Sequence, residues 1–164
     1  MKINYLFPHR FKKFGWIVFI SVLVFYVLCL FNQDLFNDYF EEKLNFKVFA
    51  IIDVDFWDRK THFFKMIKNN IIDELILCPL IISGILVGFS KVKVEDEMVS
   101  KIRLESLVWA TYVNYVILLF GLIFVYGMTF LDILYANIFS LLLFFIILFH
   151  WKLYQYNKMS SDEE

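Results

Sequence analysis

Four long stretches of the chain carry almost no charge, and they constrain the fold more than any other feature of the sequence. They comprise residues 15–31, 71–89, 106–127 and 132–151. Together they contain 78 residues but only three charged side chains, Asp73, Glu74 and Asp132, whereas the other 86 residues carry 30 charges. Apolar stretches of about 20 residues are typical of membrane-spanning helices, so the pattern predicts a small membrane protein with four spans.

The overall composition excludes several other classes of protein. The chain is 60% hydrophobic and 20% charged, whereas soluble domains are about half apolar and one quarter charged. A soluble globular enzyme and a disordered chain are therefore excluded. The net charge of −1 and the absence of a basic patch exclude nucleic acid as a partner.

The first apolar stretch follows a basic N-terminal region, as it does in a signal peptide. No small residues suitable for a cleavage site follow it, because the chain continues as Asn32-Gln33-Asp34. We expect residues 15–31 to remain as the first span, which is roughly 26 Å long as a helix. The two cysteines lie inside predicted spans, at 29 and 78, so no disulfide scaffold is expected.

The distribution of Lys and Arg predicts how the spans are oriented. With the N-terminus inside, the inner segments hold ten of these residues and the outer loop 32–70 holds six. The sequence therefore predicts a single domain over residues 1–164: an all-α bundle of four transmembrane helices in the inner membrane, with both termini cytoplasmic. It also predicts one extracytoplasmic loop of about 38 residues, at 32–70, and a cytoplasmic helical arm at 90–105.

Gly84 and Gly88 form a G-x-x-x-G pattern in the second stretch. Small residues at this spacing let another helix approach closely. We expect them to pack within the bundle, with a face for homo-oligomer formation as the alternative.

Polar side chains inside the spans predict a layer of interhelical hydrogen bonds. Ser21, Ser83 and Asn114 lie roughly 9, 9 and 12 Å from the inner ends of their predicted spans. Asn137 lies roughly 21 Å from the inner end of the fourth span, so we do not expect it to pair with Asn114. None of the three residues in the layer is ionisable, which favours a packing role over a substrate site.

The outer loop contains two segments with opposite tendencies. Residues 45–52 are rich in β-branched and aromatic side chains and favour a strand, whereas 61–68 has apolar residues at helical spacing and favours a helix on the membrane surface. The acidic segment 53–58, with His62 nearby, is a weak candidate for a divalent cation. It lacks the Gly and Glu of a calcium-binding loop, so we expect a solvated turn and no metal or cofactor.

The predicted arm 90–105 carries an apolar stripe formed by Val94, Met98 and Ile102. Residues four apart lie on one face of a helix. This stripe either packs on the protein's own inner surface or docks a partner protein.

The motifs of common enzymes are absent. No glycine-rich phosphate loop, H-E-x-x-H or G-x-S-x-G sequence occurs, and no histidine has a metal-ligand partner four residues later. We therefore do not expect an enzyme.

Several polar segments, spread over most of the chain, resemble those of a set of small bacterial membrane proteins. They are 8–16 (PHRFKKFGW), 68–74 (KNNIIDE), 89–91 (FSK), 95–98 (EDEM), 103–110 (RLESLVWA) and 113–115 (VNY). On these residues the chain resembles an uncharacterised family of small four-span inner-membrane proteins from Bacteroidota. The resemblance implies the four-span architecture and implies no activity, ligand or catalytic residue.

These observations favour a non-enzymatic accessory, sensor or regulatory subunit that acts through protein contacts in the lipid bilayer. The alternative is a small transporter or channel that works as a homo-oligomer through Gly84 and Gly88.

Overall fold

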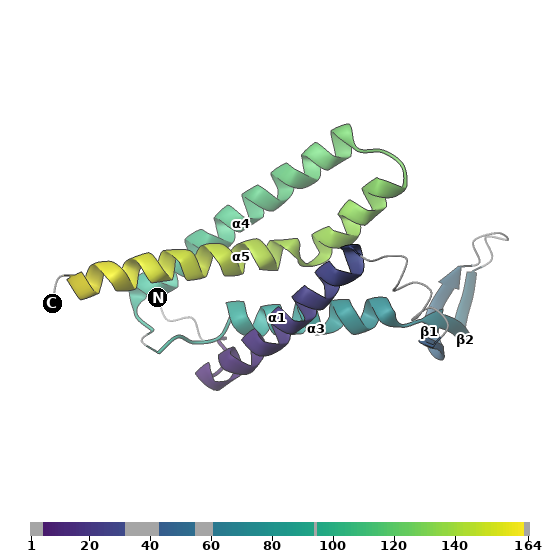
Figure 1. The fold of residues 1–164 in the computed structure, drawn as a ribbon, viewed down its shortest axis with the longest axis horizontal. Helices are drawn as coiled ribbons and strands as arrows, with labels where there is room; N and C mark the ends of the chain where they lie inside the picture. The colour runs from purple at the N-terminus through teal and green to yellow at the C-terminus, as the bar shows by residue number, and fades with distance from the viewer. Residues whose placement is uncertain (1–4, 32–42, 55–60, 94, 163–164) are drawn as a thin grey trace. The chain divides into compact units, whose positions relative to one another are not determined.

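The computed structural model describes residues 5–31, 43–54, 61–93 and 95–162. The chain divides into two compact units, one formed by Met1–Val22 with Pro79–Glu164 and the other by Leu23–Cys78. The elements are α1 (His9–Phe31), β1 (Asn45–Val54), β2 (Thr61–Asn70), α3 (Ile72–Gly88), α4 (Glu97–Phe124) and α5 (Met128–Asp162), in that order (Figure 1).

Three of the described helices are long and apolar enough to cross a membrane: His9–Cys29, Glu97–Phe124 and Met128–Met159. They coincide with three of the four predicted spans. α3 covers the remaining one, but it has only 17 residues and contains Pro79. Helices of this length and composition are compatible with a membrane protein.

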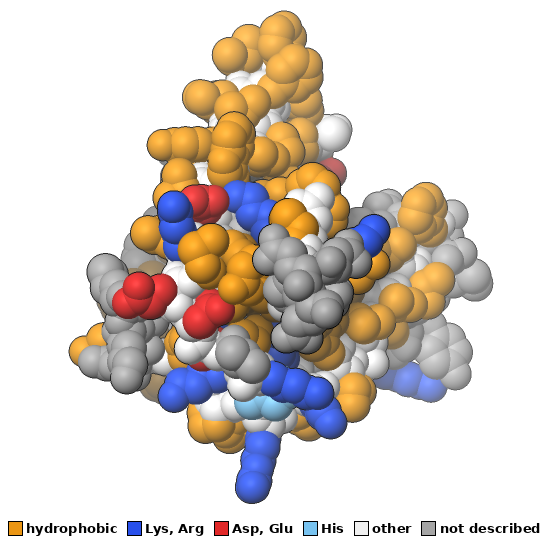
Figure 2. Space-filling view, turned by 90° about the vertical axis from the view of Figure 1, so that its left-hand side faces the viewer, with side chains coloured by type: hydrophobic (Ala, Val, Ile, Leu, Met, Phe, Trp, Pro, Cys, Tyr) orange, Lys and Arg blue, Asp and Glu red, His pale blue; other side chains and the backbone are white. Residues whose placement is uncertain are grey.

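In the first unit, α4 and α5 form an antiparallel hairpin (Figure 1). The turn between them contains Gly127, whose φ of 75° lies in the left-handed region that glycine tolerates. Their core includes Val99, Ala110, Phe145 and Phe149, all nearly inaccessible to solvent. Hydrophobic side chains cover the outside of the projecting end of this hairpin (Figure 2), as expected for helices that face lipid or a partner.

In the second unit, β1 and β2 form an antiparallel hairpin with Asn45 opposite Asn70 and Val54 opposite Thr61. The predicted strand at 45–52 is confirmed. The predicted surface helix at 61–68 is wrong, because this segment is strand β2, and the all-α fold class is corrected accordingly. A short run of apolar residues fits both periodicities, and pairing with β1 satisfies the backbone of the strand.

Candidate functional site

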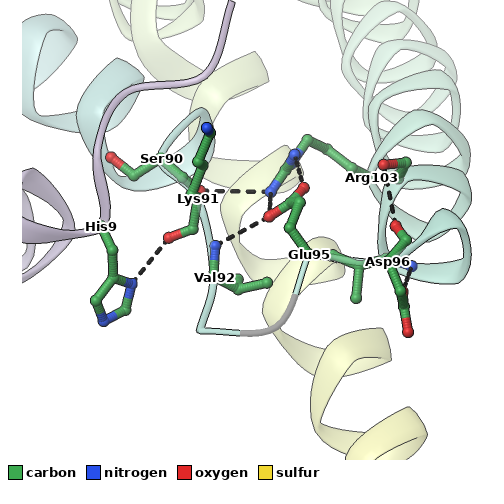
Figure 3. Close-up of polar contacts among 9 residues, drawn as sticks. His9, Ser90, Lys91, Val92, Glu95, Asp96 and Arg103 are labelled. Atoms are coloured by element: carbon green, nitrogen blue, oxygen red, sulfur yellow. Dashed lines mark hydrogen bonds and ion pairs between the residues drawn. The ribbon is translucent and has the colours of Figure 1, made fainter. Parts of the chain in front are cut away.

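A buried arginine lies near the beginning of α4. The side chain of Arg103 is only 4% exposed, and its two terminal nitrogens bond to the two carboxylate oxygens of Glu95 at 2.6 and 3.3 Å (Figure 3). Nη2 also approaches the carbonyl oxygen of Ser90 at 3.4 Å. The guanidinium lies 4.9 Å from the ring centroid of Phe149 on α5. We call Ser90, Glu95, Arg103 and Phe149 the Arg103 cluster; its cation is compensated by a carboxylate and an aromatic face.

The segment before α4 is held by two consecutive carboxylates. Asp96 caps the helix by accepting a hydrogen bond from the backbone N–H of Val99 at 2.7 Å. Its other oxygen accepts from the Tyr156 hydroxyl at 3.0 Å. Glu95 also accepts from the N–H of Val92 at 3.0 Å. These contacts fix the connector between α3 and α4 against α5.

The segment preceding α1 joins the same region through a short parallel β-bridge between Phe7 and Ser90. Phe7 donates to the carbonyl of Phe89 and accepts from the N–H of Lys91, both at 2.9 Å. His9 Nδ1 lies 2.9 Å from the Lys91 carbonyl, and because a carbonyl only accepts, Nδ1 carries the proton. The start of α1, the end of α3, the start of α4 and the last turns of α5 thus meet at one end of this unit.

A hollow of about 380 Å³ opens beside the Arg103 cluster. Three segments line it, and its residues are His9, Lys12, Val92, Lys93, Leu153 and Asn157. We call it the cationic hollow, because it contains two lysines and no carboxylate.

The structure places Gly84 and Gly88 on the face of α3 that packs against other helices of the same unit. A Cβ built at Gly84 would contact Leu142 and Phe19, both at 3.4 Å. A Cβ at Gly88 would lie 2.6 Å from the ring of Phe145 on α5. Both glycines are buried, so their close packing is used within the chain.

The predicted layer of Ser21, Ser83 and Asn114 is wrong. The two serine hydroxyls donate to carbonyls of their own helices, at Ile17 and Leu80. In the described part of the chain no hydrogen bond joins the three residues.

Asn114 instead pairs with α5, which the depth estimate excluded. Its Oδ1 accepts from the Asn137 amide at 3.2 Å and from the Ser140 hydroxyl. The estimate measured depth from assumed inner ends, whereas the short turn between α4 and α5 sets the register. Asn114 lies ten residues before the end of α4 and Asn137 nine residues after the start of α5.

The predicted arm 90–105 is only partly helical, because α4 begins at Glu97 after its Asp96 cap. Val94 lies outside the described residues. Met98 is half exposed, and Ile102 packs against the core of α4 and α5. The stripe is therefore divided between the protein's own core and its surface.

Two further candidates lie in the second unit. Of the acidic segment 53–58 only Asp53 and Val54 are described, and Asp53 lies opposite His62. The described residues contain no group of three potential metal ligands. A mostly apolar hollow of about 490 Å³ lies between the hairpin and the first turn of α3. At its rim the Asn69 amide donates a hydrogen bond to the Glu74 carboxylate at 3.1 Å.

Sequence reasoning missed Arg103, although a signal was present. The buried residues of α4 are Val99, Arg103, Ser106, Ala110, Asn114 and Gly121. Their spacing is helical, and Ser106 and Ala110 are small residues four apart, the pattern of a close helix contact. In the sequence, Ser106 and Ala110 indicate the packed face, and Arg103 lies one turn before Ser106 on that face.

Comparison with known proteins adds no relative, since no family model, curated protein or solved structure matches the chain.

Proposed function

We propose that this chain is a four-span membrane protein whose termini lie on the same side of the inner membrane. The support is the meeting of four helix ends in the first unit. The start of α1 contacts the segment after α3 through Phe7 and His9, and the start of α4 contacts the last turns of α5 through Asp96 and Tyr156. A chain that begins and ends at the same end of a helical bundle crosses the membrane an even number of times.

In this proposal α3 is the second of the four spans. Its 17 residues extend roughly 26 Å as a helix, at the lower limit for crossing the hydrocarbon core. Glu74 and Asp73 in its first turn then lie at the outer interface, where they oppose the positive end of the helix dipole.

We further propose that the protein is a non-enzymatic accessory or regulatory subunit that binds a partner protein through the outer face of α4. The observation that carries this proposal is Tyr115, which is 55% exposed. Along the helix it lies about 15 Å from Glu105, near the middle of the span. Tyr112, one turn earlier, is 61% exposed and packs edge-on against Trp109.

A phenol at this depth in lipid leaves its hydroxyl without an acceptor. Tyrosines normally lie at the membrane interfaces, where water satisfies them. An unpaired hydroxyl in an apolar medium costs on the order of 1–3 kcal/mol. The hydroxyls of Tyr112 and Tyr115 have no hydrogen-bond acceptor among the described residues, so an acceptor on a partner helix stabilises this face.

The transporter alternative required Gly84 and Gly88 to form the oligomer interface. Both glycines already face side chains of α1 or α5, which leaves no free glycine face for a second copy. This packing favours the accessory function over an oligomeric carrier.

The test is photocrosslinking in native membranes with a benzophenone amino acid at position 115, followed by mass spectrometry of the adduct. Ile17, which is 68% exposed on α1, serves as a control position in another span. We expect one crosslinked protein from position 115 and not from position 17. With the benzophenone placed instead at Leu119, which is 56% exposed one turn later on α4, Tyr115→Phe should reduce recovery of that complex several-fold, because it removes only the hydroxyl.

Tyr126→Phe is the matched control variant, because the Tyr126 hydroxyl already donates to the Ile123 carbonyl at 2.8 Å. It should leave the complex unchanged. Adducts to lipid alone at position 115, with no crosslinked protein, would contradict the partner proposal. Flux of a defined solute through proteoliposomes of the purified chain would favour a transporter instead.

A further inference from the structure

The cationic hollow has an excess of positive charge that the described chain does not balance. Lys12 from α1 and Lys93 from the connector both line it. Neither forms an ion pair with a described carboxylate. The adjacent Glu95 is occupied by Arg103 and by the N–H of Val92, and Asp96 is occupied by Tyr156 and Val99.

The segments that carry the two lysines are joined by backbone contacts. The bridge between Phe7 and Ser90 joins the segment before α1 to the connector, and His9 bonds to the carbonyl of Lys91. Lys12 is half-buried and its ammonium lies 5.9 Å from the ring centroid of Phe149. Because Lys12 is positioned in advance, the site loses less entropy when an anion binds than a pair of unrestrained lysines would.

The remaining lining residues suit a ligand with a polar head and an apolar body. Asn157 is exposed at the rim, whereas Val92 and Leu153 supply an apolar wall. His9 is the first residue of α1, and a helix N-terminus favours negative charge. Lys and Arg side chains gather around a histidine on this face of the molecule (Figure 2).

We propose that the cationic hollow binds a phosphate group, between Lys12 and Lys93. In the four-span arrangement the hollow lies at the level of the inner headgroups, because its residues lie just beyond the apolar parts of α1, α3 and α5. The phosphate is then that of an anionic phospholipid, and basic pockets between spans on this side of a membrane commonly hold such headgroups. This lipid source rests on the proposed membrane placement, whereas the phosphate chemistry does not.

The experiment uses the full chain purified in mild detergent. Native mass spectrometry measures binding of phosphatidylglycerol, with zwitterionic phosphatidylcholine as the control lipid, and calorimetric titration measures binding of inorganic phosphate. The test variant is K12Q/K93Q. The matched control is K13Q/K101Q, which removes the same charge from residues that do not line the hollow.

We expect the wild-type chain to prefer phosphatidylglycerol, and K12Q/K93Q to weaken its binding about tenfold, while K13Q/K101Q binds as the wild type does. Binding of inorganic phosphate with the same dependence on Lys12 and Lys93, but no preference for phosphatidylglycerol, supports the phosphate site with a soluble ligand and counts against the membrane placement. Equal losses of phosphatidylglycerol binding in K12Q/K93Q and K13Q/K101Q overturn the proposal. So does a wild-type chain that neither prefers phosphatidylglycerol to phosphatidylcholine nor binds inorganic phosphate.

If K12Q/K93Q does not fold, K93Q alone provides the same comparison, because the Lys93 side chain is exposed and forms no hydrogen bond or ion pair with the other described residues. K12R/K93R, which keeps both charges, should retain binding. The crosslink at Tyr115 is independent of this site, so failure of the partner proposal and failure of the phosphate proposal are distinguishable.

Discussion

The two glycines of the G-x-x-x-G pattern should respond differently to the same substitution by alanine. At Gly88 an added Cβ lies 2.6 Å from Cε1 and 3.0 Å from Cδ1 of Phe145. That ring is fully buried, so it has no space into which to move. At Gly84 the nearest atoms lie at 3.4 Å, which is close to ordinary van der Waals contact.

The expected magnitudes follow from two opposing effects. Overpacking a well-packed core costs about 1–3 kcal/mol, and replacing glycine by alanine inside a helix gains about 0.5–1 kcal/mol. Gly84→Ala should therefore be neutral or stabilising by a few tenths of a kcal/mol. Gly88→Ala should lose about 1–2 kcal/mol, because the clash exceeds the gain in propensity, which is small at the last residue of α3. In a chain of this size that corresponds to a fall in Tm of about 3–6 °C.

The measurement is thermal unfolding of the purified variants in one detergent, monitored by circular dichroism at a single protein concentration. The double variant Gly88→Ala with Phe145→Leu should recover part of the loss, because the leucine side chain removes the ring atoms that clash. A Gly88→Ala protein as stable as Gly84→Ala would refute the packing of α3 on α5 described above. So would the absence of any coupling between positions 88 and 145.

Two pairs of substitutions test the polar contacts of α4 by the same unfolding assay. Glu95→Ala leaves the buried charge of Arg103 without its carboxylate and should cost about 3 kcal/mol of stability. Lys152→Ala breaks the more exposed pair with Glu105 at 3.2 Å and should cost less than about 1 kcal/mol. Equal losses of stability in the two variants would contradict the burial of Arg103. Asn114→Ala should cost about 1 kcal/mol and more than Asn137→Ala, because Asn114 accepts two hydrogen bonds and Ser140 still reaches it when Asn137 is removed. The reverse order of these two variants would show that Asn137 has another role.

The sequence predicted the helices better than their contacts. Length and apolar content alone identified 106–127 and 132–151, because a helix satisfies its own backbone and needs no information from elsewhere in the chain. The strand at 45–52 was also predictable from its β-branched and aromatic residues. Its partner at 61–70 was not, because only pairing with β1 distinguishes a strand from an amphipathic helix there.

The polar contacts failed for a different reason. The pairing of Asn114 with Asn137 depends on where one short turn lies, and a difference of a few residues in the assumed ends of two helices misplaces it by several ångströms. The Arg103 cluster combines residues 90, 95, 103 and 149, and no local spacing links the last of these to the others. The buried stripe of α4 indicated which face Arg103 occupies, but its partners follow only from the packed structure.

The parallel bridge between Phe7 and Ser90 also has a consequence for biosynthesis. Phe7 bonds to Phe89 and Lys91, which the ribosome adds more than 80 residues later. The N-terminal segment therefore cannot reach its final position until more than half of the chain has been synthesised. In the proposed membrane placement, the basic residues around Lys12 stay exposed on the nascent chain until then and are available to fix the direction in which α1 inserts. The segment around Phe7 therefore reaches its final position only after residues 89–91 have been synthesised.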